Sequence, residues 1–289
     1  MTLRSEHTNY SMDNLNEKNN MSAYSDLTAS EDVLYTDMGA WFQGERVVIR
    51  GKDLFTEFKN SSWIEILLFG ITGKNYTEDQ IKLFNGMWTL CGSYPDPRIW
   101  NNRIASLAGT ARSTTALAIG AATAVSEAKI YGRGPDIRSI DFLLRSKDKI
   151  DSGIELSEVV REELKINRSI AGFGRPVINK DERIKPMHDL AEELDLLNGD
   201  YVKLVYEVEE YLLKGRYRMR MNIASFLAAL MADQGFTVRE YYQFMVLGFS
   251  AGMFPCYIDA VNKPEGSFFP LRCERINYTG VAQRKWNSK

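Results

Sequence analysis

The chain contains 289 residues, enough for one large domain or two ordinary ones with a substantial core. Hydrophobic residues make up 44% and charged residues 26%, a composition typical of globular proteins that argues against a disordered or fibrous chain. The formal net charge of -2 excludes a global field that would attract nucleic acid or an anionic membrane, so we expect neither as a partner.

The cysteine and histidine content restricts the chemistry further. Cys91, Cys256 and Cys273 lie far apart without a C-x-x-C pair, which suits a reducing compartment and argues against a disulfide framework or a cysteine zinc site. The two histidines are His7, in a polar N-terminal stretch, and His188. We therefore expect no metal, and a mechanism that needs two imidazoles is nearly excluded.

The sequence predicts no targeting signal and no membrane span. The N-terminus shows no basic segment followed by an apolar one, the pattern of a signal peptide. The longest uncharged run of small and apolar residues, 113–126, is shorter than the roughly 20 residues that span a bilayer. We predict a cytoplasmic protein.

The first elements in chain order are an arm and a hairpin. Residues 1–30 are rich in Asn, Ser, Glu and Asp and have few large apolar side chains, so they bury too little surface to offset chain entropy and are predicted to form a flexible arm. In residues 33–49, the polar turn 43–45 separates the apolar segments 40–42 and 47–49, a pattern that predicts a small β-hairpin.

The rest of the chain has the pattern of helices. Ser62 precedes an apolar helix at 63–69, and Thr77 with Gln80 forms a capping box before another. Residues 113–130 have the small side chains of a helix that neighbours approach closely. Further apolar periodicity predicts helices over 187–197, 223–231 and 241–254, the last ended or kinked by Pro255.

Two glycine-containing turns, residues 130–135 and 171–176, interrupt this helical pattern. Glycine in such turns provides a positive φ or a close approach of the backbone. A simple link between helices explains the same residues equally well, because an isolated Gly-x-Gly is a weak signal.

Several motifs along the chain share one order and spacing with a known family. They are Arg-Gly-Lys-Asp-Leu at 50–54, Ser-Trp-Ile-Glu-Ile-Leu-Leu-Phe-Gly at 62–70, Thr-Glu-Asp at 77–79, Gly-Phe-Gly at 172–174, Asp-Glu-Arg at 181–183 and Tyr-Thr-Gly at 278–280. From about residue 33 to 280 the sequence resembles the citrate synthase family.

This resemblance implies an all-α, citrate synthase-like fold with a short N-terminal β-hairpin. It implies a large helical domain, residues 31–135 and 236–289, and a smaller helical domain, residues 136–235, that closes over a cleft. It further implies a homodimer and a coenzyme A thioester as substrate. Members of the family make or break a carbon–carbon bond next to a thioester, using an Asp base, two His residues and arginines that bind carboxylates.

The sequence departs from the family where this chemistry takes place. Tyr131 and Arg175 occupy the positions of the two His residues, and Ala224 occupies the position of the base. Phe249 replaces a carboxylate-binding Arg, whereas Arg183 matches the family. An alanine does not accept a proton, so these substitutions argue against ordinary condensation with oxaloacetate.

Three residues are candidates for altered catalytic roles. Tyr131 could donate a hydrogen bond to an enolate or thioester oxygen, or be a core tyrosine. Arg175 would place fixed positive charge in the cleft or pair with a coenzyme phosphate. Asp96 could be a relocated base, although Pro-Asp-Pro at 95–97 is also an ordinary turn and helix-start signal.

Substrate and coenzyme contacts are assigned by the same comparison. The candidate substrate-binding residues are Arg183, Arg98, Arg103, Asn222 and Arg133, where arginine can bind a carboxylate or phosphate bidentately and Asn222 can equally be a cap. The family's glycine loop wraps the adenine, so the candidate coenzyme-binding residues are Gly172, Phe173, Gly174 and Lys180.

Two functions from different classes remain open. The first is an acyltransferase or lyase that acts on an acyl thioester, with CoA as the carrier, and makes or breaks a carbon–carbon bond with a small-molecule acceptor other than oxaloacetate. The second is a catalytically inactive homologue that serves as a binding, regulatory or partner subunit. The Tyr and Arg replacements favour the enzyme, and the missing base favours the inactive homologue.

Overall fold

The computed structural model describes residues 28–92, 94–129, 132–175, 180–268, 273–282 and 284. The predicted flexible arm therefore lies outside the described residues except at its end, 28–30. The chain divides into two compact units after Asn60, and each is described by itself. The division into a large domain and a small domain at 136–235 stays a prediction.

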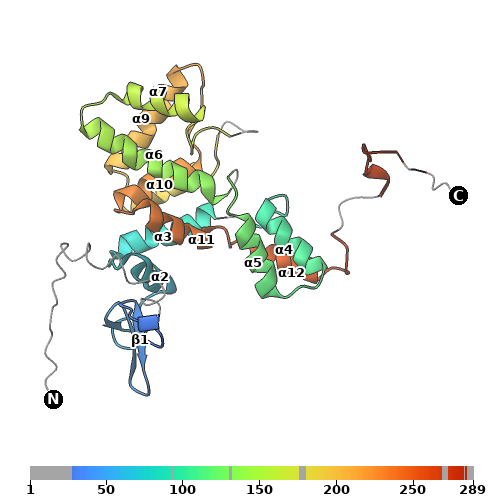
Figure 1. The fold of residues 1–289 in the computed structure, drawn as a ribbon. Coiled ribbons are helices and arrows are strands. Elements are labelled where there is room, and N and C mark those ends of the chain that lie inside the picture. The colour runs from blue at the N-terminus through green and yellow to red at the C-terminus, as the bar shows by residue number, and fades with distance from the viewer. Residues whose placement is uncertain are drawn as a thin grey trace, which may run out of the picture. The chain divides into compact units, whose positions relative to one another are not determined.

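The first unit contains a three-stranded antiparallel sheet, drawn in blue in Figure 1. Strands β1 (Gly39–Phe42) and β2 (Arg46–Ile49) form a hairpin in which Phe42 pairs with Arg46. Gly44 in the turn has a φ of 72°, a conformation that glycine adopts without strain. The hairpin prediction is confirmed, and the short strand β3 (Lys52–Asp53) extends the sheet beyond it.

The second unit is helical, as predicted. Its helices in the described part of the chain are α2 (Trp63–Thr72), α3 (Glu78–Cys91), α4 (Trp100–Thr110), α5 (Thr115–Val125), α6 (Arg133–Asp151), α7 (Leu156–Asn167), α8 (Ile184–Glu193), α9 (Asp200–Lys214), α10 (Ile223–Asp233), α11 (Val238–Gly248) and α12 (Met253–Val261), followed by the 3-10 turn η2 (Cys273–Arg275).

The helix starts follow the capping signals in the sequence. Ser62 precedes α2, and its backbone N–H donates to Glu65 at 2.6 Å. The Thr77 N–H donates to Gln80 at 2.8 Å, and the Gln80 N–H donates back to the Thr77 hydroxyl at 3.3 Å. These bonds satisfy backbone donors that a helix leaves free at its first turn.

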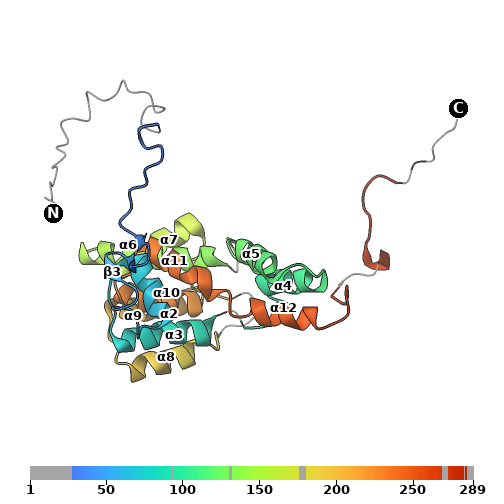
Figure 2. The same ribbon diagram turned by 90° about the horizontal axis from the view of Figure 1, so that it is seen from below.

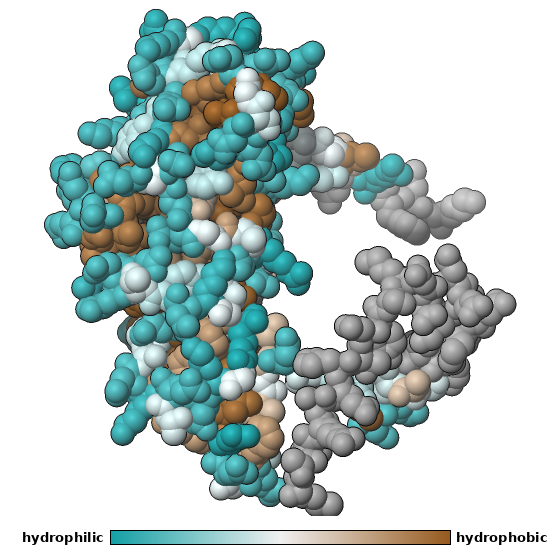
Figure 3. Space-filling view, turned by 90° about the vertical axis from the view of Figure 1, so that its left-hand side faces the viewer, coloured by the Kyte–Doolittle hydropathy of each residue, from teal (hydrophilic) through white to brown (hydrophobic). Residues whose placement is uncertain are grey.

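Helix α10 is the centre of the core. Every residue from Ile223 to Ala232 is buried, because α6 and α9 pack against it (Figure 1). Around this centre the helices are amphipathic: α9 buries Val202, Val205 and Val208 at a helical spacing and exposes charged residues between them. On the face drawn in Figure 3, hydrophilic residues surround separate hydrophobic areas.

Helices α4, α5 and α12 form a second packed group, and they lie side by side in Figures 1 and 2 although α12 is far from the others in sequence. Ala105 and Ala122 are fully buried at this contact, so small side chains permit the close approach predicted for residues 113–130. The Arg112 guanidinium fastens the end of α12 by donating to the carbonyls of Val261 at 2.6 Å and Lys263 at 2.7 Å.

Two predicted helix boundaries are wrong. Residues 241–254 do not form one helix, because the chain turns at 249–252 between α11 and α12. Pro255 lies in the first turn of α12, where a missing N–H costs no helical hydrogen bond. It therefore lies near the start of a helix and does not end one. The helix predicted over 187–197 stops at Glu193, and Asp195 has a φ of 55°.

By length and composition alone, the stretch Val238–Val261 is apolar enough to cross a membrane, unlike the shorter run at 113–126. Core helices pass the same test, and α11 packs against α2, α3 and α6. The expectation of no membrane contact stays a prediction.

Candidate active site

A cavity of about 510 Å³ lies among the helices of the second unit, within the size range of small-molecule sites. Its walls come from α2, α3, α6, α10, α11 and the turn before α8. Most of the lining is apolar, including Trp63, Leu67, Met87, Trp88, Ile170, Phe173, Leu227, Phe244, Met245 and Phe249. The charged residues of the lining are Lys129, Asp136, Arg138, Arg175, Asp181 and Arg183.

The glycine turn at 172–174 forms one wall of the cavity. Gly172 and Gly174 have φ values of 84° and 83°, which strongly favour glycine. A Cβ on Gly172 would stand 2.8 Å from the Ser225 backbone nitrogen, so this turn also needs glycine for close approach. For this turn, of the two explanations that the sequence left open, the structure supports positive φ and close approach; residues 130 and 131 of the other turn lie outside the described residues.

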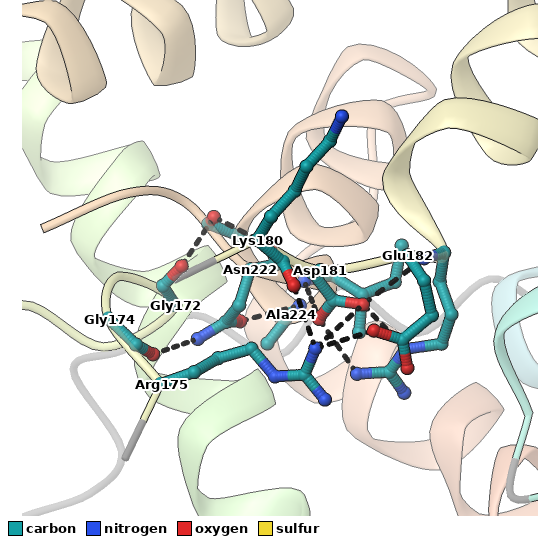
Figure 4. Close-up of polar contacts among 11 residues, drawn as sticks. Gly172, Gly174, Arg175, Lys180, Asp181, Glu182, Asn222 and Ala224 are labelled. Atoms are coloured by element: carbon teal, nitrogen blue, oxygen red, sulfur yellow. Dashed lines mark hydrogen bonds and ion pairs between the residues drawn. The ribbon is translucent and has the colours of Figure 1, made fainter. Parts of the chain in front are cut away.

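The start of α10 holds this turn in place. The Asn222 N–H donates to the Gly172 carbonyl at 2.8 Å, and its side-chain Nδ2 donates to the Gly174 carbonyl at 2.9 Å (Figure 4). The Ser225 hydroxyl donates to Gly172 at 2.7 Å. Asn222 Oδ1 accepts from the Ala224 N–H at 3.0 Å, so both polar atoms of the Asn222 amide serve the cap and the turn.

Asp181 and Arg183 form a fixed ion pair at the cavity. Arg183 Nε and Nη2 donate to the two carboxylate oxygens of Asp181, each at 2.9 Å, in a bidentate arrangement. Asp181 also accepts from the Ile223 N–H at 3.0 Å, which joins the pair to α10. Burial would raise the pKa of Asp181, but these hydrogen bonds and the Arg183 charge outweigh it and hold the pKa below its usual value.

Arg175 and Lys180 lie on either side of a segment outside the described residues. Arg175 lines the cavity, and its Nη1 donates to Glu182 at 2.7 Å and to the Lys180 carbonyl at 3.2 Å. The Lys180 side chain is exposed, does not line the cavity and points away from the other labelled residues in Figure 4. The structure therefore brings Gly172, Phe173, Gly174 and Arg175 together at the cavity wall without Lys180.

Asp96, Arg98 and Arg103 do not line the cavity. Arg98 donates to both carboxylate oxygens of Asp96, with Nη2 2.6 Å from Oδ2 and Nε 3.1 Å from Oδ1, and its side chain is 84% exposed. Arg103 is exposed, and its Nε donates to the Pro97 carbonyl at 3.2 Å. These contacts agree with the turn and helix start that the sequence also indicated.

Arg133 is buried away from the cavity lining, with a side chain only 2% exposed. Its Nη2 pairs with Glu127 and donates to the Thr123 carbonyl at 3.1 Å, and its guanidinium lies 5.9 Å from the centre of the Tyr242 ring. These contacts tie α6 to the end of α5 and to α11. Tyr131, just before α6, lies outside the described residues.

Asp136 lines the cavity and was not singled out from the sequence. It lies in the first turn of α6 and is 7% exposed. Among the described residues its Oδ2 has no hydrogen-bond partner. Burial raises the pKa of Asp136 from 3.8 to about 7, against the opposing charges of Arg183 and Arg133.

A signal for Asp136 was present in the sequence. Ile140 and Leu143, four and seven residues further along, are fully buried on the same face of α6. An acidic residue that begins an apolar helical stripe is a candidate for burial, and a buried carboxyl is a candidate for function. The position just after Gly-Pro instead resembled an ordinary helix start.

Two neighbouring groups remain protonated near neutral pH. Burial raises the pKa of the Cys91 thiol to about 12, so Cys91 offers no thiolate for nucleophilic attack. Burial also raises the pKa of Tyr241 well above its usual value, and the Tyr241 hydroxyl has no partner among the described residues.

One group of possible metal ligands occurs outside the cavity lining. His188, Asp189 and Glu192 bring ligand atoms within 4.8 Å of one another on α8. Lys185 already donates to Asp189 at 2.6 Å, and Glu192 is exposed, so the group has the features of an ordinary charged helix surface. The absence of a metal stays a prediction.

The sequence matches the family described as "Citrate synthase, C-terminal domain" over residues 7–262, which is most of the chain. The chain belongs to the citrate synthase family. The resemblance seen in its motifs is therefore confirmed, together with the mostly helical fold. A search of curated proteins gave no match.

Solved structures of low sequence identity share this fold. Citryl-CoA lyase from Hydrogenobacter thermophilus gives a TM-score of 0.77 at 19% identity, covering 88% of this chain and 98% of the lyase. ATP citrate lyase from Methanothrix soehngenii, in complex with citrate and coenzyme A, gives 0.72 at 16% identity, covering 91% of this chain and 45% of that enzyme. This chain thus spans less than half of that lyase.

A third structure is citrate synthase from the archaeon Thermoplasma acidophilum, in a ternary complex with carboxymethyl coenzyme A and oxaloacetate. It gives a TM-score of 0.60 at 20% identity and covers 79% of this chain and 59% of the synthase. At such identities these structures establish the fold of this chain.

Proposed function

We propose that this protein makes or breaks a carbon–carbon bond next to an acyl thioester, with coenzyme A as the carrier and an acceptor other than oxaloacetate. The observation that carries the proposal is the cavity of about 510 Å³ in a citrate synthase family chain, apolar over most of its lining and with Arg183 fixed at its wall. An apolar pocket with a few oriented polar groups is the usual form of a small-molecule site.

Phe249 and two ion pairs at the cavity support a less acidic acceptor than oxaloacetate. Phe249 lines the cavity at the position of a carboxylate-binding arginine in the family. Asp181 already neutralises part of the Arg183 charge, and Glu182 pairs with Arg175. These two pairs reduce the charge that Arg183 and Arg175 offer to a ligand, so an acceptor with fewer carboxylates than oxaloacetate suits Arg183, although Lys129 and Arg138 also line the cavity.

The glycine turn supports the assignment of a coenzyme thioester. Gly172, Phe173 and Gly174 form a cavity wall that is hydrogen-bonded to α10, and the relatives solved with coenzyme A or carboxymethyl coenzyme A share the fold. Arg175 is the proposed cation beside this wall, and Tyr131 remains a proposed hydrogen-bond donor next to Gly132, which lines the cavity. A homodimer and a cytoplasmic location remain predictions from the resemblance and the composition.

The second candidate is an inactive homologue that serves as a binding or regulatory subunit. It is favoured by Ala224 at the position of the family's base and by the use of Arg133, Arg175 and Asp96 in internal ion pairs. The two candidates differ in whether a bound thioester undergoes chemistry.

A calorimetric titration with acetyl-CoA tests the binding step. We expect micromolar affinity for the wild-type protein. Ala224→Phe should weaken binding at least tenfold, because the phenyl ring on α10 would occupy part of the cavity. Ala111→Phe, at an exposed position after α4, is the matched control and should bind as the wild type does. No binding at millimolar acetyl-CoA, or equal binding by Ala224→Phe, would contradict the proposal.

A further inference from the structure

Asp136 lies where α6 faces the start of α10. The Gly172 turn fits between these two helices, since a Cβ on Gly172 would collide with Ser139 on α6 and Ser225 on α10. Asp136 precedes Ser139 by one helical turn and lines the same cavity as Ala224 of α10. A carboxyl group on α6 therefore reaches the cavity, where Ala224 provides none and Asp181 is held in its ion pair with Arg183.

The Asp136 carboxyl has one oxygen that is enclosed and unpaired in the part of the chain that the structure describes. Its Oδ2 is buried and has no hydrogen-bond partner within the described ranges, although buried polar atoms in proteins are nearly always paired. An unpaired buried carboxyl oxygen is costly for folding alone. Asp136 nevertheless lines the cavity, so its carboxyl group is within reach of a bound molecule.

The charged and titratable groups around Asp136 come from four elements. Arg133 lies on α6 itself and Arg183 at the start of α8, and both attract its carboxylate. Tyr241 of α11 and Cys91 of α3 face the same region, and both stay neutral near pH 7 because burial raises their pKa values. The first turn of α6 adds the positive end of the helix dipole. The ionised and protonated forms of Asp136, whose pKa is about 7, are thus both accessible at neutral pH.

We propose that Asp136 is the general base that removes the α-proton of the bound acyl thioester. This inference rests on the proposed function and specifies its first step. The α-carbon–hydrogen bond breaks and an O–H bond forms on the Asp136 carboxylate. The electron pair of the broken bond moves onto the thioester carbonyl oxygen, which becomes an enolate stabilised by the positive charge of Arg183. In the reverse direction Asp136 returns the proton, so no other reagent is consumed.

The experiment follows exchange of the acetyl-CoA methyl protons for deuterium in D₂O by proton NMR. Wild-type protein should accelerate the exchange, and Asp136→Asn should lower the rate by about 10²- to 10⁴-fold, the usual contribution of a general base. Asp141→Asn, a half-exposed acid on the same helix paired with Arg145, is the matched control and should exchange as the wild type does.

The affinity of each variant for acetyl-CoA separates this inference from the proposed function. Asp136→Asn should bind acetyl-CoA within a few-fold of wild type, and wild-type exchange should rise with pH through about 7, as Asp136 ionises. A structural role for Asp136 would not produce this pH profile. Exchange by Asp136→Asn at the wild-type rate would overturn the inference and leave the proposed function standing, whereas failure of the wild type to bind would overturn the proposed function itself.

Discussion

Replacing Asp136 with Asn is expected to change the pH dependence of stability in a defined direction. The pKa of Asp136 is about 7 in the folded protein against 3.8 ordinarily, because burial disfavours the charged carboxylate. The folded state therefore holds a proton that the unfolded state releases between these values. The stabilisation is complete below about pH 4 and is lost as the pH rises through 7.

The size of this effect follows from the two pKa values. A difference of about three pKa units corresponds to roughly 4 kcal/mol once both states are ionised, at 1.36 kcal/mol per unit. Between pH 5 and pH 8 the wild-type protein should lose about 2 to 3 kcal/mol of unfolding free energy relative to Asp136→Asn, which does not titrate. Any constant cost of the Asn amide cancels in this comparison.

Urea unfolding of both proteins at several pH values measures the difference directly. Asp141→Asn, from an exposed ion pair, controls for the loss of a surface carboxylate and should show no comparable trend. A wild-type to Asp136→Asn difference that stays constant from pH 5 to pH 8 would refute the burial argument for Asp136. A difference that changes in the opposite direction would mean that Asp136 is held as a carboxylate.

Three further substitutions test the framework of the site by urea unfolding. Asp181→Asn should destabilise the protein by about 3 to 5 kcal/mol, because it leaves Arg183 without its buried partner. Its control, Asp189→Asn, removes one member of an exposed ion pair and should cost less than about 1 kcal/mol. Equal losses of stability in the two variants would contradict the role of the buried pair. Gly172→Ala should lower the free energy of unfolding more than Gly153→Ala does, since both glycines have positive φ but only Gly172 is crowded by Ser225. A smaller loss of stability at Gly172 would show that the turn can relax. Thr77→Ala should lose about 1 kcal/mol with its helix cap, and an unchanged stability would show that the cap contributes nothing.

Local sequence signals predicted much of the fold correctly. Ser62 and Thr77 mark helix starts because their capping bonds span only three residues, and the apolar stripe from Ile223 to Met231 marks α10 because it is buried all round. Strand β3 has only two residues, too few for a periodic pattern. The turn between α11 and α12 has only Ser250 and Gly252 as turn signals within an otherwise apolar stretch, so the sequence suggested one long helix.

The site was predictable in part. The glycine turn and Arg183 were recognised because they match family motifs, and the structure brings them together at one cavity. Asp96 and Arg133 form ion pairs instead of lining the cavity, with Arg98 in the same turn and Glu127 at the end of α5. The sequence does not show which partners the folded chain brings near. Asp136 went unnoticed because its position after Gly-Pro resembled an ordinary helix start, although it begins the buried stripe of α6.

Deuterium exchange catalysed by the wild-type protein tests the central claim most directly, because it separates an enzyme from an inactive binding subunit. At saturating acetyl-CoA in D₂O near pH 8, the account predicts loss of the methyl proton signal well above the rate measured without protein. Binding of acetyl-CoA with no exchange above that background rate would contradict the account and favour the inactive homologue.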